Sequence, residues 1–155
     1  MEARAKNDKV ISTCRELAHF IEDGHLGYKK AAEETRDPRL KSFCLRQSEQ
    51  RNSFLNELNG IIRNYGASPE DSGTVKGALY RQWMDVKAGL TGSGDIAIIN
   101  SCIFGEEWAI KAVHDALDED ELPMDVRSSI EKQHTVCHAA LTELKSMKEQ
   151  YKSNS

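Results

Sequence analysis

The chain has 155 residues, of which 39% are hydrophobic and 30% charged, so it is long enough for one domain with a buried core. Its net charge of −4 argues against a surface for nucleic acid or for an anionic membrane, and neither partner is expected. No apolar run approaches the roughly 20 residues of a membrane helix, and the amino-terminal segment has no apolar signal core. The sequence therefore predicts a cytoplasmic protein with a single domain over residues 1–155.

Apolar residues recur every three or four positions along nearly the whole chain, which predicts an all-α protein. The first helix is expected over residues 7–35, and its inward stripe is Val10, Cys14, Leu17, Ile21, Gly24, Tyr28 and Ala32. Asp37 and Pro38 then supply an N-cap and a first helical residue for the second helix. This helix is expected to stop at Gly66, a favourable left-handed cap position. Because the turn between the two helices is so short, they must be antiparallel neighbours.

Residues 66–93 are too many for an unstructured loop in a compact domain. A shorter fifth helix is predicted inside them, over residues 74–90, and it is long enough to return along most of the bundle as a crossover. The next long helix is expected over residues 94–119, and the last one from Pro123 to about Tyr151. Two antiparallel hairpins joined by a long crossover predict a ferritin-like four-helix bundle.

Polar side chains interrupt the apolar stripes near the middle of the helices. The members of this predicted buried polar core are Tyr28, Gln47, Arg51, Glu106 and Gln133. At about 1.5 Å per residue, Arg51 and Glu106 each lie about 18–20 Å from the start of two helices that run parallel in a ferritin-like bundle. An ion pair between them would offset the cost of burying each charge. The polar core is therefore interpreted as structural, with no catalytic residue and no cofactor expected.

The same positions raise the alternative of a metal site in the bundle core. A ferritin-type di-metal site takes a Glu from each of two helices and a Glu-x-x-His motif from each of the other two. The chain has one Glu-x-x-His, but Glu131 lies far from the inward stripe and His134 lies at its margin. Glu106 alone is clearly an inward carboxylate, so the ligand count falls short. The alternative site for iron, manganese or zinc consists of Glu106, Glu131, His134 and His138.

His134 and His138 are also one helical turn apart, a spacing that could hold a divalent metal ion at the surface. The positions of His19, His25 and His114 share no spacing with this pair. With no third ligand converging on the pair, the interpretation favoured by the sequence is two solvated histidines.

Two aromatic residues, Phe104 and Trp108, point away from the inward stripe of their helix. Large apolar groups on a surface usually indicate a partner or a covering element. The fifth helix, residues 74–90, would cover them, and a homodimer through this face is the competing interpretation. The four cysteines, Cys14, Cys44, Cys102 and Cys137, fall on the stripes of different helices and are interpreted as free thiols that pack in the core.

Five short motifs occur in the following order along the chain. They are Gly27-Tyr28-Lys-Lys-Ala-Ala-Glu33-Glu, Asp37-Pro-x-Leu40, Glu57-Leu58, Gly66-x-x-Pro-Glu-Asp-Ser-Gly73-x-Val-x-Gly77-Ala-Leu and Gly105-Glu106-Glu. With them the chain resembles a bacterial family of small ferritin-like four-helix-bundle proteins of unknown function, over about residues 8–148. The resemblance implies the fold, a bacterial cytoplasmic setting and an association with stress responses, and it implies no reaction.

The expected function is a structural or interaction role without catalysis, in a bundle whose metal site is degenerate. The alternative is a metal-binding or oxidative-stress protein that holds an ion in the bundle core through Glu106.

Overall fold

A computed structural model of the chain describes residues 2–69 and 94–153. These residues form four long helices: α1 (Glu2–Glu34), α2 (Pro38–Asn64), α4 (Asp95–Leu117) and α5 (Met124–Ser153). Within the described ranges all regular secondary structure is helical, as the sequence predicts. None of the helices in these ranges combines the length and apolarity needed to span a membrane.

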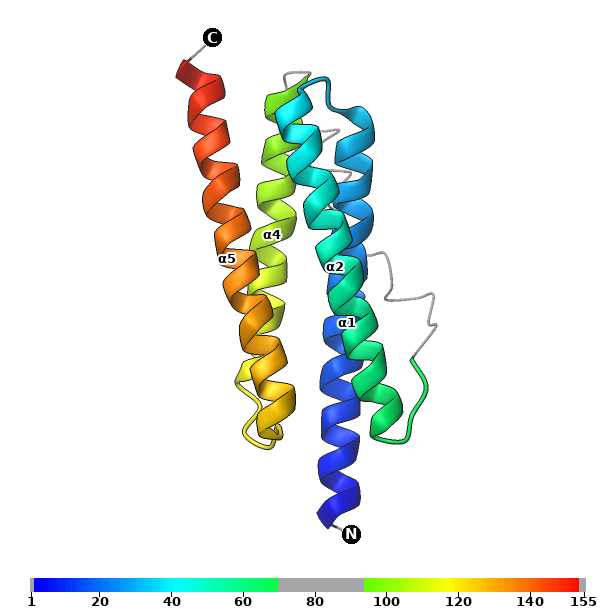
Figure 1. Cartoon of the computed structure of the whole chain (residues 1–155). Coiled ribbons are helices and arrows are strands. Elements are labelled where there is room, and N and C mark those ends of the chain that lie inside the picture. The colour runs from blue at the N-terminus through cyan, green and yellow to red at the C-terminus, as the bar shows by residue number, and fades with distance from the viewer. Residues whose placement is uncertain (1, 70–93, 154–155) are drawn as a thin grey trace.

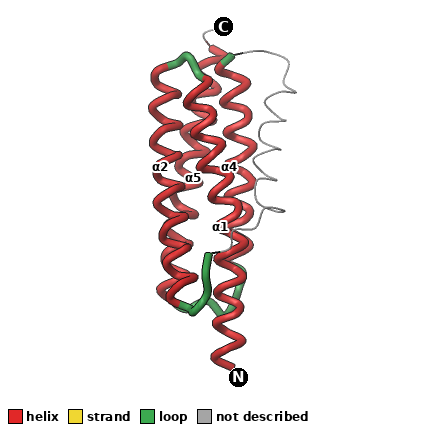
Figure 2. Tube along the Cα trace, turned by 90° about the vertical axis from the view of Figure 1, so that its right-hand side faces the viewer, coloured by secondary structure: helices red, strands yellow, loops and turns green. Residues whose placement is uncertain are grey.

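The four helices lie along one another in two antiparallel hairpins (Figure 1). α1 packs against α2, α4 packs against α5, and α1 also packs against α4. α2 and α4 run in the same direction, and α1 and α5 run in the opposite one, as Figures 1 and 2 both show. The predicted fifth helix over residues 74–90, and the crossover that contains it, lie outside the described residues.

The turn between α1 and α2 forms at the predicted cap. Asp37 is the N-cap of α2, and its carboxylate accepts a hydrogen bond of 2.8 Å from the backbone N–H of Arg39. Pro38 opens the helix, where its missing N–H costs no hydrogen bond. α2 ends at Asn64 with Tyr65 as its C-cap, and the next residue, Gly66, takes a left-handed φ of 93°, as the sequence predicts for this stop.

The turn between α4 and α5 avoids placing negative charge inside a helix end. α4 stops at Leu117, just before the acidic residues 118–121, rather than at residue 119. The side chain of Arg127 then donates hydrogen bonds of 2.8 Å to the carbonyl of Leu117 and 2.6 Å to that of Glu119. A cation therefore satisfies carbonyls that have no partner within the helix.

The hydrophobic core consists of two apolar clusters, one toward each end of the bundle. One includes Leu40, Phe43, Ile99 and Leu144, and the other includes Leu17, Leu58, Val113 and Ile130. The predicted polar core lies between them along the helices. The apolar halves thus exclude water from the level at which Arg51 and Glu106 lie.

The inward stripes differ from the sequence prediction at a few positions. The helical period predicts Ile61 as an inward residue of α2 and Leu141 as one of α5, but both are half-buried. Their neighbours Ile62 and Ala140 are buried instead. One residue is a rotation of about 100° around a helix, so each difference is a small error in the helix phase. α1 also begins at Glu2, earlier than expected, since residues 2–6 are good helix formers with no breaker among them.

Candidate functional site

The polar core receives side chains from all four described helices. Tyr28 comes from α1, Arg51 and Gln47 from α2, Glu106 from α4 and Gln133 from α5. Tyr28, Arg51, Glu106 and Gln133 are almost inaccessible to solvent, and Gln47 is half-buried. Four residues that the sequence places on separate helices therefore face one another in the centre of the bundle.

Glu106 is the central acceptor of this network, because both of its carboxylate oxygens accept hydrogen bonds from protein donors. Its Oε1 accepts a hydrogen bond from Arg51 Nη2, which is also an ion pair, and its Oε2 accepts one from the hydroxyl of Tyr28. The side chains of Arg51 and Glu106 are each only 1% exposed. The Arg51 guanidinium also lies 5.5 Å from the centroid of the Tyr28 ring, a favourable cation–π separation.

A second set of hydrogen bonds surrounds the other guanidinium nitrogen. Arg51 Nη1 donates to Gln47 Oε1 at 2.9 Å and to Gln50 Oε1 at 2.5 Å. Gln50 and Gln133 then exchange amide hydrogen bonds of 2.6 and 3.1 Å between α2 and α5. Gln133 also donates to Cys137 Sγ at 3.6 Å. Both terminal nitrogens of the buried guanidinium, Nη1 and Nη2, are therefore hydrogen-bonded, and a buried charge is tolerated only with such partners.

Gln50 is the member of the network that the sequence pattern missed. It lies one residue before Arg51, off the centre of the apolar stripe of α2, and is half-buried. Its long side chain reaches inward to Arg51 and Gln133 although its backbone position does not face the centre. The spacing of three residues from Gln47 is the signal in the sequence that places both amides on neighbouring positions of α2.

The protonation states of the network follow from its burial and its charges. Burial and the Glu106 carboxylate raise the pKa of Tyr28 well above its ordinary value of 10.0. Burial by itself would lower the pKa of Arg51, but the adjacent Glu106 carboxylate outweighs it and holds this pKa above its ordinary value. Burial and Glu106 raise the pKa of Cys137 to about 12, although Arg51 acts in the opposite direction. Near neutral pH, Arg51 is a cation, and Tyr28 and Cys137 keep their protons.

Residues 9–119 match the protein family described as "Domain of unknown function (DUF2383)". The chain belongs to this family. Among solved structures, it is similar to a mutant of Dps1 from Mycobacterium smegmatis, with a TM-score of 0.79 and 12% sequence identity over 93% of this chain and 97% of that chain. No curated protein matches the sequence. At 12% identity the likeness shows the fold alone, and it confirms the predicted ferritin-like four-helix bundle.

The polar core of this DUF2383 protein does not have the ligand set that a di-metal site in a ferritin-like bundle requires. Such a site needs several carboxylates and histidines pointing to one place. In the described residues the network contains one carboxylate, Glu106, and a cation, Arg51, in contact with it. Asp23 is a second buried carboxylate on α1, but it lies five residues before Tyr28, about 140° around the helix from it. Arg51 also repels a metal cation and competes with it for the carboxylate of Glu106.

The residues of the alternative metal set are not brought together. Glu106 is buried in the centre, whereas Glu131 and His138 are exposed and His134 is half-buried on α5. The inward residue of that segment is Gln133, as the helix phase predicts. An ion held jointly by Glu106, Glu131, His134 and His138 is therefore inconsistent with this geometry.

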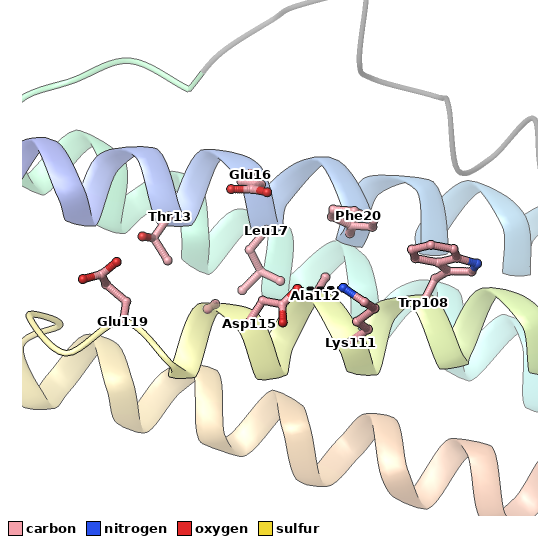
Figure 3. Close-up of a pocket in the computed structure, with 10 residues that line it drawn as sticks. Thr13, Glu16, Leu17, Phe20, Trp108, Lys111, Ala112, Asp115 and Glu119 are labelled. Carbon is pink, nitrogen blue, oxygen red and sulfur yellow. Dashed lines mark hydrogen bonds and ion pairs between the residues drawn. The ribbon is translucent and has the colours of Figure 1, made fainter.

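A pocket of about 280 Å³ lies between α1 and α4, and none of its lining residues belongs to the polar core. Figure 3 shows Phe20 of α1 and Trp108 of α4 projecting from facing helices into this space. Trp108 is 38% exposed and packs edge-on against Phe104, with ring centroids 6.4 Å apart. The predicted covering helix, residues 74–90, lies outside the described residues. Both that cover and a homodimer through Phe104 and Trp108 stay predictions.

Proposed function

We propose that this protein is a non-catalytic ferritin-like bundle with a structural or interaction role, in which an ion pair takes the place of a metal centre. The observation that carries the proposal is the double occupation of Glu106. Its two oxygens are bound by Arg51 and Tyr28, and all three side chains are buried. Because both oxygens are already bonded, a metal ion or a substrate proton would have to compete with Arg51 and Tyr28 for this carboxylate.

The protonation states of the network support a structural role. General bases and nucleophiles need a group that is deprotonated near neutral pH or poised to become so. The raised pKa values of Tyr28 and Cys137 keep both groups protonated, and Arg51 remains a permanent donor. The polar core is suited to hold four helices at a fixed register, and it is poorly suited to proton transfer.

We also propose that the protein works in the bacterial cytoplasm. All four cysteines are free and buried, which fits a reducing compartment such as the bacterial cytoplasm. The association with stress responses rests on the family resemblance alone. The interaction role is assigned to the surface around Trp108, where an exposed aromatic ring borders a pocket.

The experiment that tests the proposal is elemental analysis of the full chain purified from medium supplemented with iron, manganese and zinc. Three proteins are compared: the natural chain, Glu106→Gln, and Glu143→Gln as a control in which an exposed glutamate changes in the same way. We expect no metal whose amount depends on Glu106, because Arg51 already neutralises that carboxylate. Metal that is equal in all three proteins belongs to another site.

The competing function is an ion held in the core through Glu106 by a metal-binding or oxidative-stress protein. It requires Arg51 to leave the carboxylate, and the buried guanidinium would then have no counter-charge. About one ion of iron, manganese or zinc per chain in the natural protein and in Glu143→Gln, lost in Glu106→Gln, would establish this competing function and overturn the ion-pair proposal.

A further inference from the structure

Three histidines gather on the surface where α4 lies beside α5. His134 and His138 are one turn apart on α5, and their ring centroids are 4.4 Å apart at an interplanar angle of 62°. His114 of α4 extends the group, with its ring centroid 6.4 Å from that of His134. The sequence gives no sign of this third member, because its proximity depends on how the two helices are paired.

We propose that His114, His134 and His138 form a binding site for a borderline divalent transition-metal ion of the zinc class. Imidazole nitrogen is a preferred ligand of such ions, and an i, i+4 pair on a helix presents two of them on one face. The third ligand comes from the adjacent antiparallel helix. The site is separate from the polar core, since none of its residues contacts Glu106 in the described network.

The rings must turn to bind one ion. A tetrahedral zinc ion with Zn–N distances of about 2.0–2.1 Å needs its ligand nitrogens roughly 3.3 Å apart. His134 is half-buried, whereas His114 and His138 are exposed, and exposed side chains change rotamer readily. The two exposed rings can therefore turn toward an ion placed next to His134.

The surrounding charges favour a cation. Asp118 Oδ2 lies 3.7 Å from His114 Nδ1, where a carboxylate can orient the ring or complete the coordination of the ion. Asp115 contributes a further carboxylate on the His114 side, where potential ligand atoms of His114, Asp115 and Asp118 lie within 4.8 Å of one another. Lys111, the nearby cation in the sequence, is paired with Asp115 at 3.1 Å.

The test is a calorimetric titration of the full chain with zinc chloride in a buffer that does not chelate the ion. We expect one zinc ion per chain, no saturable binding to His134→Gln, and binding to His114→Gln that is at least tenfold weaker. His19→Gln is the matched control, because His19 is half-buried on α1 and outside the cluster. It should bind zinc as the natural chain does. Circular dichroism confirms that each variant is folded.

Two further measurements distinguish this site from other ways of binding zinc. Cobalt substituted for zinc should give the visible absorption of a tetrahedral nitrogen-ligated ion, and this signal should disappear in His134→Gln. Light scattering should show the same mass with and without zinc. Equal zinc binding by His114→Gln and the natural chain, no saturable binding by the natural chain, or a zinc-dependent dimer would each overturn the three-histidine site within one chain.

Discussion

Arg51 is the residue on which the centre of this bundle depends. Removing a guanidinium from water costs several kcal/mol in effective terms, and only a well-placed partner with further hydrogen bonds offsets this cost. Arg51 has such surroundings: the carboxylate of Glu106, the amides of Gln47 and Gln50, and the face of Tyr28. The intact pair changes the free energy of unfolding little, but burying either charge without the other is strongly destabilising.

Substitution of one member of the pair should be more damaging than substitution of both. Arg51→Met leaves the Glu106 carboxylate buried without its counter-charge, and Glu106→Leu leaves the guanidinium in the same state. We expect either change to lower the free energy of unfolding by about 3–5 kcal/mol. The double variant should recover most of the loss, because two apolar side chains can pack in the same space. Urea unfolding followed by circular dichroism measures all three.

The chain supplies a matched control for this cycle. Arg46 of α2 and Glu143 of α5 form a second arginine–glutamate pair between helices, but at 3.7 Å with side chains 62% and 49% exposed. Arg46→Met, Glu143→Leu and their combination should each change the free energy of unfolding by about 1 kcal/mol or less. If the Arg51 and Glu106 single variants were no more destabilising than these surface variants, the buried pair would not organise the core.

At the scale of the helices, the sequence predicts which face of each helix is buried, and the equal depths of Arg51 and Glu106 predict that these two residues meet. It does not predict contacts between residues at the edges of the buried faces. The helical period alone brings Tyr28, Arg51, Glu106 and Gln133 inward, because a rotation of about 100° per residue fixes the face. The cluster of His114 with His134 could not be predicted in this way. It depends on the register and rotation of α4 against α5, which packing determines and no single helix encodes.

Two residues of the turn between α1 and α2, Thr35 and Asp37, bond this turn to the other hairpin. The carboxylate of Asp37 caps α2 through Arg39 N–H and also accepts a hydrogen bond from the hydroxyl of Tyr151 in α5. Just before it, the hydroxyl of Thr35 donates to Asp95 at the start of α4, at 2.5 Å. The turn between α1 and α2 is therefore bonded to both helices of the other hairpin.

Asp37→Ala should destabilise the protein by more than the loss of a helix cap alone. An N-cap substitution costs about 0.5–2 kcal/mol, and the lost bond to Tyr151 adds to it. Tyr151→Phe is the control, because it removes only the second bond and should cost about 1 kcal/mol. Chemical unfolding compares the two. Equal losses in the two variants would mean that the cap contributes nothing measurable to α2.

At the scale of the whole molecule, the folded state buries three weakly acidic groups, the thiols of Cys14 and Cys137 and the hydroxyl of Tyr28. Cys14 lies in the apolar cluster at one end of the bundle, whereas Tyr28 belongs to the polar core and Cys137 lies beside it. Burial raises the pKa of Cys14 from 9.0 to about 11, and burial with Glu106 raises that of Cys137 to about 12. The folded state thus holds these protons more tightly than the unfolded chain does.

This difference predicts that the protein loses stability in alkaline solution. Above about pH 9 the unfolded chain releases its thiol protons while the folded chain keeps those of Cys14 and Cys137, so the unfolded state binds fewer protons and the free energy of unfolding falls as the pH rises. Tyr28 adds to the loss above pH 10 in the same direction. Urea midpoints at pH 7, 9, 10 and 11 should decline most steeply after pH 9.

The variant with Cys14→Ala and Cys137→Ala starts from a lower stability because of its cavities, but its decline should be shallower, since two of the three groups are gone. Parallel declines in the two proteins would assign the alkaline loss to other groups.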